Sequence, residues 1–373
     1  MPALAALERA VRGLRALDLE PPRDGGAGGS QAFDLYLTTD PALGGAAWSE
    51  PRLYARGFDR ANAFGIATLE RGCRLDSEMA RIVAQAALLR LDGGLEDGTL
   101  AMQSSYIARL IAPCAPIETA AIDRFQREPE RALSEGKRQR FEGSMLFSAY
   151  LDEVHGKGQP GGVVNGLVAI AAQSTPAKAT HWQNEPDLFD VLRRLLPARE
   201  LTLGDALVDF AVARAFFGSR SDGQHLSDGE RFGDFGRVRF EWVVPYKSLP
   251  RRLAPRAPLQ PSGSTFVWID TRGVPGDRGI VAAIRWEASY VYQWSMVRVD
   301  AKGRELGRLN AGGVFGRDSA QLTVETLGEA SGLLVVGTSL GDDDRKNAFD
   351  PDRVLGESSF ELTLHPLPGG GGS

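Results

Sequence analysis

The chain has 373 residues, of which 43% are hydrophobic, and its formal net charge is −5 at pH 7. This length suits two domains better than one small core, and the slightly acidic balance offers no electrostatic field for nucleic acid. No apolar run approaches the roughly 20 residues that span a bilayer, so the sequence predicts no transmembrane segment.

Residues 1–30 are expected to form a short amphipathic helix and a Gly-rich connector. Charged side chains interrupt the apolar residues of the first part. They are those of Glu8, Arg9, Arg12 and Arg15. This pattern argues against a signal peptide and leaves two interpretations open. The protein is cytosolic, or it is a secreted protein whose signal peptide has been replaced by Met1. The tail 368–373 is typical of an engineered flexible linker, which favours the second interpretation.

Residues 31–249 are expected to form a mainly helical domain. Two segments near its start, 33–38 and 63–69, alternate like strands. Helical spacing of apolar residues follows at about 77–91, 96–112, 117–125, 144–154, 162–172, 187–196 and 202–217.

The helices at 77–91 and 96–112 are joined by a short Gly-rich turn, so they are expected to form an antiparallel hairpin. Cys73 precedes the first helix and Cys114 follows the second, and the chain has no other cysteine. Because the outer ends of such a hairpin lie together, the two Cα atoms can approach within about 6 Å. We predict a disulfide, the alternative being two unrelated buried thiols. A disulfide indicates an oxidising compartment: the periplasm, the cell surface or the outside.

The C-terminal part is expected to be a β-sandwich of immunoglobulin-like size over residues 264–367. A Pro-rich segment, 250–263, is expected to link it to the helical domain. Beyond this linker the apolar period changes from helical to alternating. The expected strands are 265–270, 279–286, 290–299, 305–309, 321–326, 332–338 and 358–365. The predicted fold class is therefore α+β, in two domains.

Several motifs occur in an order that resembles a known family. They are FDLYLTTDP near the start, GSMLFSAYLDEVHG after the helix pair, ALVDFAVARAFFG before the linker, and YQWSMVRVDAKGRELGRL and LLVVGTSLG in the sandwich. This order resembles secreted or lipoprotein-type gluzincin-like metallopeptidases of myxobacteria. The resemblance implies a helical peptidase-like domain followed by a β-sandwich.

The catalytic motif of such a peptidase is missing. A gluzincin needs two histidines one helical turn apart to hold Zn²⁺ and a glutamate between them to activate water. The resemblance places this motif on the helix at 77–91, which contains no histidine. No two of the four histidines are four residues apart: His155, His181, His225 and His365. Glu96, near the third-ligand position of the family, is insufficient alone. We therefore expect no catalytic residue, no metal site and no cofactor.

Other residues are assigned structural roles, with a functional alternative for some. No Gly-x-Ser-x-Gly elbow occurs. His155 is interpreted as a helix C-terminal imidazole that the helix dipole favours. His181, beside Trp182, is interpreted as a surface or half-buried residue, although it could line a pocket. His225, in a loop of Gly, Ser and Asp, is interpreted as solvated.

Two clusters in the sandwich keep an open alternative. An acidic loop is interpreted as solvated, with Ca²⁺ binding as the alternative; its members are Asp342, Asp343, Asp344, Asp350 and Asp352. An aromatic group is interpreted as core, with a ligand platform as the alternative; its members are Trp268, Trp286, Tyr290, Tyr292 and Trp294.

The predicted function is that of a catalytically inactive, metallopeptidase-like extracytoplasmic protein. It is expected to be a binding or structural scaffold with a protein partner in the cell envelope. One alternative is a hydrolase with an unrecognised site between the two domains. The other is a surface adhesion or carbohydrate-binding module that acts through the β-sandwich. The sequence leaves open the partner, the oligomeric state and a lipid anchor.

Overall fold

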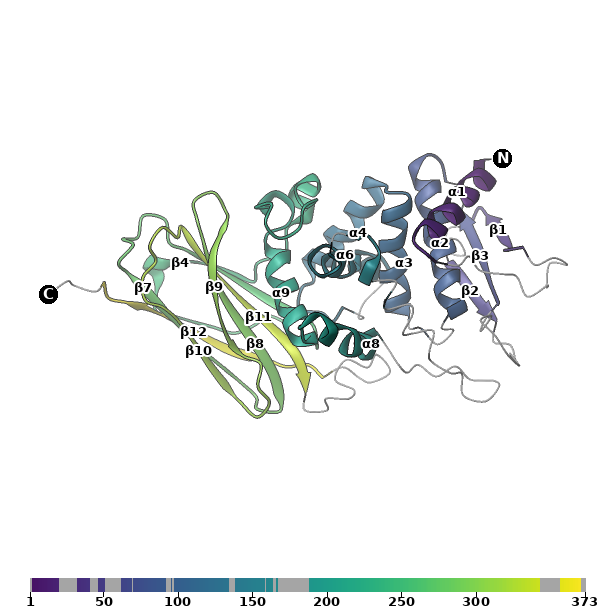
Figure 1. Ribbon diagram of the computed structural model, residues 1–373. Helices are drawn as coiled ribbons and strands as arrows, with labels where there is room; N and C mark the ends of the chain where they lie inside the picture. The colour runs from purple at the N-terminus through teal and green to yellow at the C-terminus, as the bar shows by residue number, and fades with distance from the viewer. Residues whose placement is uncertain are drawn as a thin grey trace. The chain divides into compact units, whose positions relative to one another are not determined.

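The computed structural model describes residues 2–19, 32–40, 46–50, 62–68, 70–91, 95, 97–133, 138–157, 159–163, 166, 188–342 and 356–369 (Figure 1). The chain divides into two compact units. The helix-rich unit comprises Met1–Ile122 and Gly136–Thr202, and the β-rich unit comprises Asp123–Glu135 and Leu203–Ser373. The mixture of helices and sheets confirms the α+β class. Among the described residues, no helix has the length and hydrophobicity needed to cross a bilayer.

The helix-rich unit combines helices with a small sheet. Its helices are α1 Pro2–Ala16, α2 Cys73–Leu91, α3 Asp97–Ile111, the first part of α4 Ala115–Arg127, α5 Arg138–Gly143, α6 Met145–His155 and α8 Leu188–Leu195. Its strands are β1 Leu35–Thr38, β2 Ala46–Glu50 and β3 Asn62–Thr68, in the order β1-β3-β2. A Cβ atom on Gly65 of β3 would lie 2.4 Å from Ile82 Cγ2 of α2, so glycine allows the sheet to pack closely on this helix.

The predicted helical hairpin is formed by α2 and α3, and its disulfide is confirmed. Cys73 and Cys114 are bonded, with their Cα atoms 5.3 Å apart. Helix α2 begins at Cys73 itself, one turn earlier than expected. On the other side of the bridge, Glu118 accepts a hydrogen bond from the backbone N–H of Cys114 at 2.9 Å. The carboxylate of Glu118 also lies 3.6 Å from Arg109 Nε.

The β-rich unit contains two sheets in a sandwich-like arrangement (Figure 1). The five-stranded sheet has the order β4-β6-β11-β8-β9, and the four-stranded sheet has the order β10-β7-β12-β5. The strands are β4 Trp242–Pro245, β5 Arg251–Leu253, β6 Ser264–Asp270, β7 Gly279–Trp286, β8 Tyr290–Val299, β9 Glu305–Gly312, β10 Ser319–Val324, β11 Gly332–Asp342 and β12 Phe360–Leu367. Each of the strands expected from the alternating pattern is present.

Two segments differ from the expected division of the chain. Residues 203–249, which we expected in the helical domain, belong to the β-rich unit. Strand β5 lies inside the expected linker 250–263 and pairs with β12 at the edge of the four-stranded sheet. An edge strand tolerates neighbouring prolines because one side of its backbone needs no partner strand.

The sandwich core lies between the two sheets. Val267 and Ile269 of β6 point into it, whereas Phe266 belongs to the opposite face, as the two-residue period of a strand requires. The core contains three members of the predicted aromatic group, Trp286, Tyr292 and Trp294. A Cβ atom on Gly337 would lie 2.4 Å from the Trp294 ring, so this glycine makes room for the indole.

The outer face of the five-stranded sheet carries a second apolar cluster. Helix α9, Leu203–Ala215, packs on β11 and β8 through side chains such as Val212. The segment 123–135 belongs to the same unit, and Arg214 joins it to α9. The Arg214 guanidinium lies 4.1 Å from the Phe125 ring centroid and donates from Nε to Gln126 Oε1 at 2.9 Å. The inner face of the five-stranded sheet is therefore covered by the other sheet, and part of its outer face is covered by α9.

Candidate functional site

A pocket of about 670 Å³ lies in the β-rich unit, on the outer face of the five-stranded sheet, where α9 ends. Five separate chain segments form it: the end of α9 with its following loop, residues 237–243, strand β6 with its adjoining residues, strand β11 with its adjoining residues, and the β8–β9 turn. The polar and aromatic side chains of its lining are those of Phe216, Ser219, Arg220, Ser221, Arg237, Phe240, Trp268, Arg272, Asp300, Lys302 and Ser331.

Stacked aromatic rings form one wall of the pocket. Phe240 and Trp268 lie parallel within 6°, with their centroids 6.0 Å apart. Both are half-buried. Trp268 reaches this face because it alternates with the core residues of β6, and Gly332 of β11 leaves space for its indole. A Cβ atom on Gly332 would lie 2.0 Å from the ring. The ligand-platform alternative therefore fits Trp268, while the core interpretation fits its neighbours in the sandwich.

Arg220 lies on this aromatic wall as a half-buried cation. Its guanidinium carbon is 3.6 Å from the Phe240 ring centroid, and its Nη1 donates to the Val238 carbonyl at 2.9 Å. Burial, reinforced by the nearby charge of Arg237, lowers the pKa of Arg220 to about 10, although Asp234 opposes the shift. The guanidinium therefore stays ionised at neutral pH. Among the described residues no carboxylate forms an ion pair with it.

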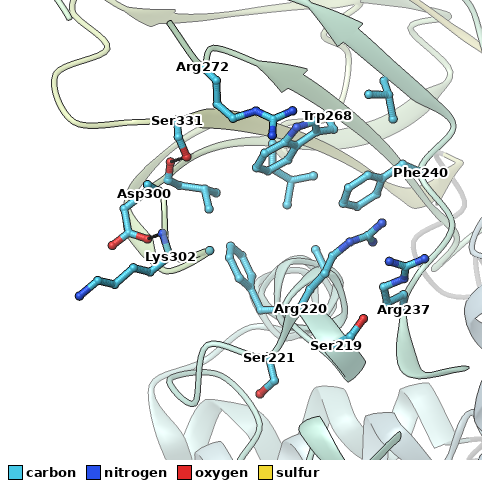
Figure 2. A pocket seen from close by; sticks show the side chains of 17 residues that line it. Ser219, Arg220, Ser221, Arg237, Phe240, Trp268, Arg272, Asp300, Lys302 and Ser331 are labelled. Atoms are coloured by element: carbon cyan, nitrogen blue, oxygen red, sulfur yellow. Dashed lines mark hydrogen bonds between the residues drawn. The ribbon is translucent and has the colours of Figure 1, made fainter. Parts of the chain in front are cut away.

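Further cations surround the pocket from several sides (Figure 2). Arg237 lies next to Arg220, and Arg272 lies near Trp268 on another side. Lys302 comes from the β8–β9 turn. The acidic side chain among the described lining residues is Asp300, which already accepts hydrogen bonds from Arg304 Nε and from the Lys302 backbone N–H, both at 2.8 Å. Arg272 is paired with Asp270, at 2.9 Å from Nε and 2.6 Å from Nη2, and Arg237 lies 3.4 Å from Asp234. Among the described residues, Arg220 and Lys302 are therefore the cations of the lining that no carboxylate pairs.

The loop that positions Arg220 depends on a glycine. Gly218 has a φ of +70°, and a Cβ atom there would lie 2.4 Å from the carbonyl oxygen of Gly233. Beside it, Ser219 Oγ donates to Asp234 Oδ1 at 2.6 Å. The same carboxylate lies 3.4 Å from Arg237 Nη1. Asp234 therefore links Ser219, the neighbour of Arg220, to Arg237.

His225 lies between two carboxylates, which corrects the solvated interpretation. Its Nδ1 is 3.0 Å from Asp222 Oδ1, and its Nε2 is 2.8 Å from Glu305 Oε2. The imidazole stacks on Phe216 with centroids 4.3 Å apart and planes within 4°. Asp222 was visible as a neighbour in sequence, but Glu305 is 80 positions away, so the sequence carried no signal of this pairing.

The other candidate residues that the structure describes are not among the lining residues of the pocket. His155 ends α6, as predicted, and its ring meets Tyr150 edge-on at 5.6 Å. His365 is exposed on β12. Asp342 ends β11. The remaining candidates, Glu96, His181, Trp182, Asp343, Asp344, Asp350 and Asp352, lie outside the described residues. The calcium alternative therefore stays a hypothesis.

This geometry suits charge recognition better than acid–base chemistry. The hydroxyl groups at the pocket, on Ser219, Ser221 and Ser331, have no imidazole beside them among the described lining residues. His225 presents both ring nitrogens to carboxylates, so neither is available to take a proton from a hydroxyl group. The described lining offers cations and aromatic faces, which bind anions and flat apolar surfaces.

Comparisons with known proteins found little similarity in sequence or structure. No protein-family model matches the sequence. No curated protein matches it. Among solved structures, one match is the pre-peptidase C-terminal domain of a collagenase from Bacillus anthracis. The two are 9% identical, and the match covers 34% of this chain and 98% of that domain, with a TM-score of 0.21. A TM-score this low supports no conclusion about fold or function.

Proposed function

We propose that the protein is a non-catalytic binding protein whose β-rich unit holds an acidic carbohydrate in the pocket around Arg220. The observation that carries this proposal is the half-buried Arg220 guanidinium, which rests on Phe240 and has no carboxylate partner among the described residues. An acidic group of a ligand would supply the missing negative charge. It would also favour the charged guanidinium against burial and against the repulsion from Arg237, which together lower the pKa of Arg220.

The aromatic wall supports a ligand with a flat apolar face. Phe240 and Trp268 are half-buried and stacked, so their exposed parts give the pocket an apolar aromatic wall. The C–H face of a sugar ring packs on such a surface, while a carboxylate or sulfate on the ring reaches the adjacent guanidinium groups. Ligand sites combine an apolar lining with a few placed polar groups in this way.

The position of the pocket favours a carbohydrate over a peptide. An extended peptide binds a sheet by adding a strand at an edge. The pocket instead lies on the face of the sheet, over β6 and β11, and both strands already have a partner on each side. A peptide would therefore have no free ladder of backbone groups there.

The disulfide and the resemblance support an extracytoplasmic setting. Cys73–Cys114 needs an oxidising compartment to persist. The metallopeptidase-like order of motifs, without a histidine pair, suits a protein that has kept a peptidase-like body as an inactive scaffold. On this proposal the scaffold presents the β-rich unit at the cell envelope. Free thiols at both positions in protein taken directly from its cells would contradict this location.

Isothermal titration with matched ligands tests the binding proposal. The probes are an oligogalacturonide, a neutral oligogalactoside of the same length, and a short Glu-rich peptide. We expect the acidic sugar to bind, the neutral sugar to bind at least about tenfold more weakly, and the peptide not to bind. Arg220→Gln should weaken binding of the acidic sugar by roughly 10- to 100-fold, because a hydrogen bond to a charged group contributes about 1.5–3 kcal/mol.

Arg285→Gln is the matched control, since Arg285 is an exposed arginine on β7 of the other sheet. It should leave the affinity unchanged. Higher salt should weaken binding to the wild type, because it screens the charges at the pocket rim. Equal affinity for the acidic and neutral sugars, or tighter binding of the acidic peptide, would refute the proposal.

A further inference from the structure

We infer that His225 is a pH-dependent latch that joins two walls of the pocket and thereby regulates ligand binding. The latch itself follows from the geometry of His225, and its effect on a ligand rests on the proposed function. One wall is the loop after α9, which carries Ser219 and Arg220. The other is the β8–β9 turn, which carries Asp300 and Lys302.

The two walls meet behind the pocket at His225. The loop continues from Arg220 to His225, and the β8–β9 turn continues to Glu305. The bond between His225 Nε2 and Glu305 Oε2, at 2.8 Å, therefore connects the walls directly. The imidazole also stacks on Phe216, which is itself part of the pocket lining. A change at His225 thus acts on both walls without contact with a ligand.

The connection requires a doubly protonated imidazole. A carboxylate is an acceptor only, so His225 must donate from both nitrogens to satisfy Asp222 and Glu305 together. A neutral imidazole has a single N–H group. After loss of a proton, a ring lone pair therefore faces a carboxylate oxygen at hydrogen-bond distance, and that contact becomes repulsive.

The surrounding groups decide which bond is lost. Asp222 also accepts the backbone N–H of Gln224 at 2.9 Å, so it stays fixed within the loop and keeps the Nδ1 proton. Glu305 accepts two hydrogen bonds from Arg308, at 2.7 and 2.8 Å, so it keeps a counter-charge without His225. The Nε2–Glu305 bond is therefore the one that breaks, and the longer contact from the Glu305 backbone N–H to Asp222 Oδ2, at 3.4 Å, is then left to join the walls.

The charged groups facing His225 favour the closed state at acidic pH. They are Asp222 on its own loop, Glu305 and Arg308 on β9, and Asp209 on α9, which binds Arg308 at 3.0 Å. Burial opposes protonation of His225, but the hydrogen bonds and charges of Glu305 and Asp222 outweigh it and raise the pKa. The latch is accordingly closed at acidic pH and opens as the pH rises through the raised pKa of His225.

Two measurements on the unliganded protein test the latch. Ring ¹⁵N chemical shifts report the protonation of His225, and amide hydrogen exchange, corrected for the intrinsic pH effect, reports opening of residues 219–221. Between about pH 5.5 and pH 8.5 we expect protection of this loop to fall at least about tenfold, with the midpoint at the titration of His225. The neutral form should carry its proton on Nδ1.

Two variants separate the latch from general effects of pH. His225→Gln should remove the pH dependence of loop protection. His365→Gln should retain it, since His365 is exposed on β12. Loop protection that does not follow the titration of His225, or that keeps its pH dependence in His225→Gln, would overturn the inference.

The ligand measurement distinguishes the two proposals. If the oligogalacturonide binds, its affinity should fall about tenfold or more across the same pH range in the wild type and stay constant in His225→Gln. Binding with no such difference would overturn the regulatory role while the proposed function stands. A loop that opens in a protein that binds no acidic sugar would support the latch and reject the proposed function.

Discussion

The two faces of the five-stranded sheet differ in how they are covered. The inner face packs on the second sheet and buries Val267, Ile269 and Trp294. The outer face is covered by α9 only along part of its length, and beyond the helix it carries the half-buried Trp268. Neighbouring residues of β6 therefore lie in different environments: Val267 and Ile269 in the closed core, and Trp268 at the pocket. The comparison indicates that incomplete coverage, rather than a distinctive motif, creates the candidate site.

The largest expected contrast is between the tryptophans of the two faces. Trp294→Ala should lower the stability of the β-rich unit by about 3–5 kcal/mol, because it leaves a large cavity in a closed core. Trp268→Ala should cost only about 1–2 kcal/mol, because this ring is half-buried. Denaturant unfolding followed by hydrogen exchange of β8 and β11 amides measures both. Equal losses would show that the outer face is as tightly sealed as the core.

A smaller contrast concerns the loop that holds Arg220. Gly218 and Gly223 both have a φ of +70°, but only at Gly218 would a Cβ atom meet other atoms within 4 Å. Gly223→Ala should lower the free energy of unfolding by about 1–2 kcal/mol, because a residue with a Cβ atom is strained at a positive φ. Gly218→Ala should cost about 1–3 kcal/mol more, because its methyl group strikes the Gly233 carbonyl. Thermal unfolding and amide hydrogen exchange of the loop compare the two variants, and similar losses of stability would show that Gly218 does not fix the loop that carries Arg220.

The smallest expected effect is the contribution of His225 to stability. Its folded-state pKa is raised, so the stabilisation is complete below the ordinary histidine value of about 6.5 and is lost as pH rises through the raised pKa. Each unit of difference corresponds to about 1.4 kcal/mol. Urea unfolding of the wild type and His225→Gln at several pH values measures this difference. If the difference in unfolding free energy between the wild type and His225→Gln did not narrow as pH increases, the assignment of a charged imidazole would be contradicted.

Elements with a local signal could be predicted from the sequence. The hairpin of α2 and α3 followed from apolar spacing and a Gly-rich turn, and the placement of Cys73 and Cys114 at its outer ends then predicted their disulfide. The alternating strands of the sandwich were equally visible. In each case the determining residues lie within one element or two successive elements.

The candidate site had no such local signal. Arg220, Phe240 and Trp268 come from different segments, and only tertiary packing brings them together. The apolar stripe of α9 could have packed in either domain, so residues 203–249 were expected in the helical one. β5 was hidden by Pro250 and Pro255, which suggested a linker although they flank an edge strand.

The course of the chain has a consequence for how the protein can be divided. Residues 123–135 belong to the β-rich unit, yet they are separated from Leu203 by a stretch of the helix-rich unit. A gene fragment that starts at Leu203 would omit Gln126, whose carboxamide binds both Arg214 and the Gly236 carbonyl. Conversely, a protease that cuts once between residues 136 and 202 would leave a nicked β-rich unit, whose two pieces are held together only by noncovalent contacts.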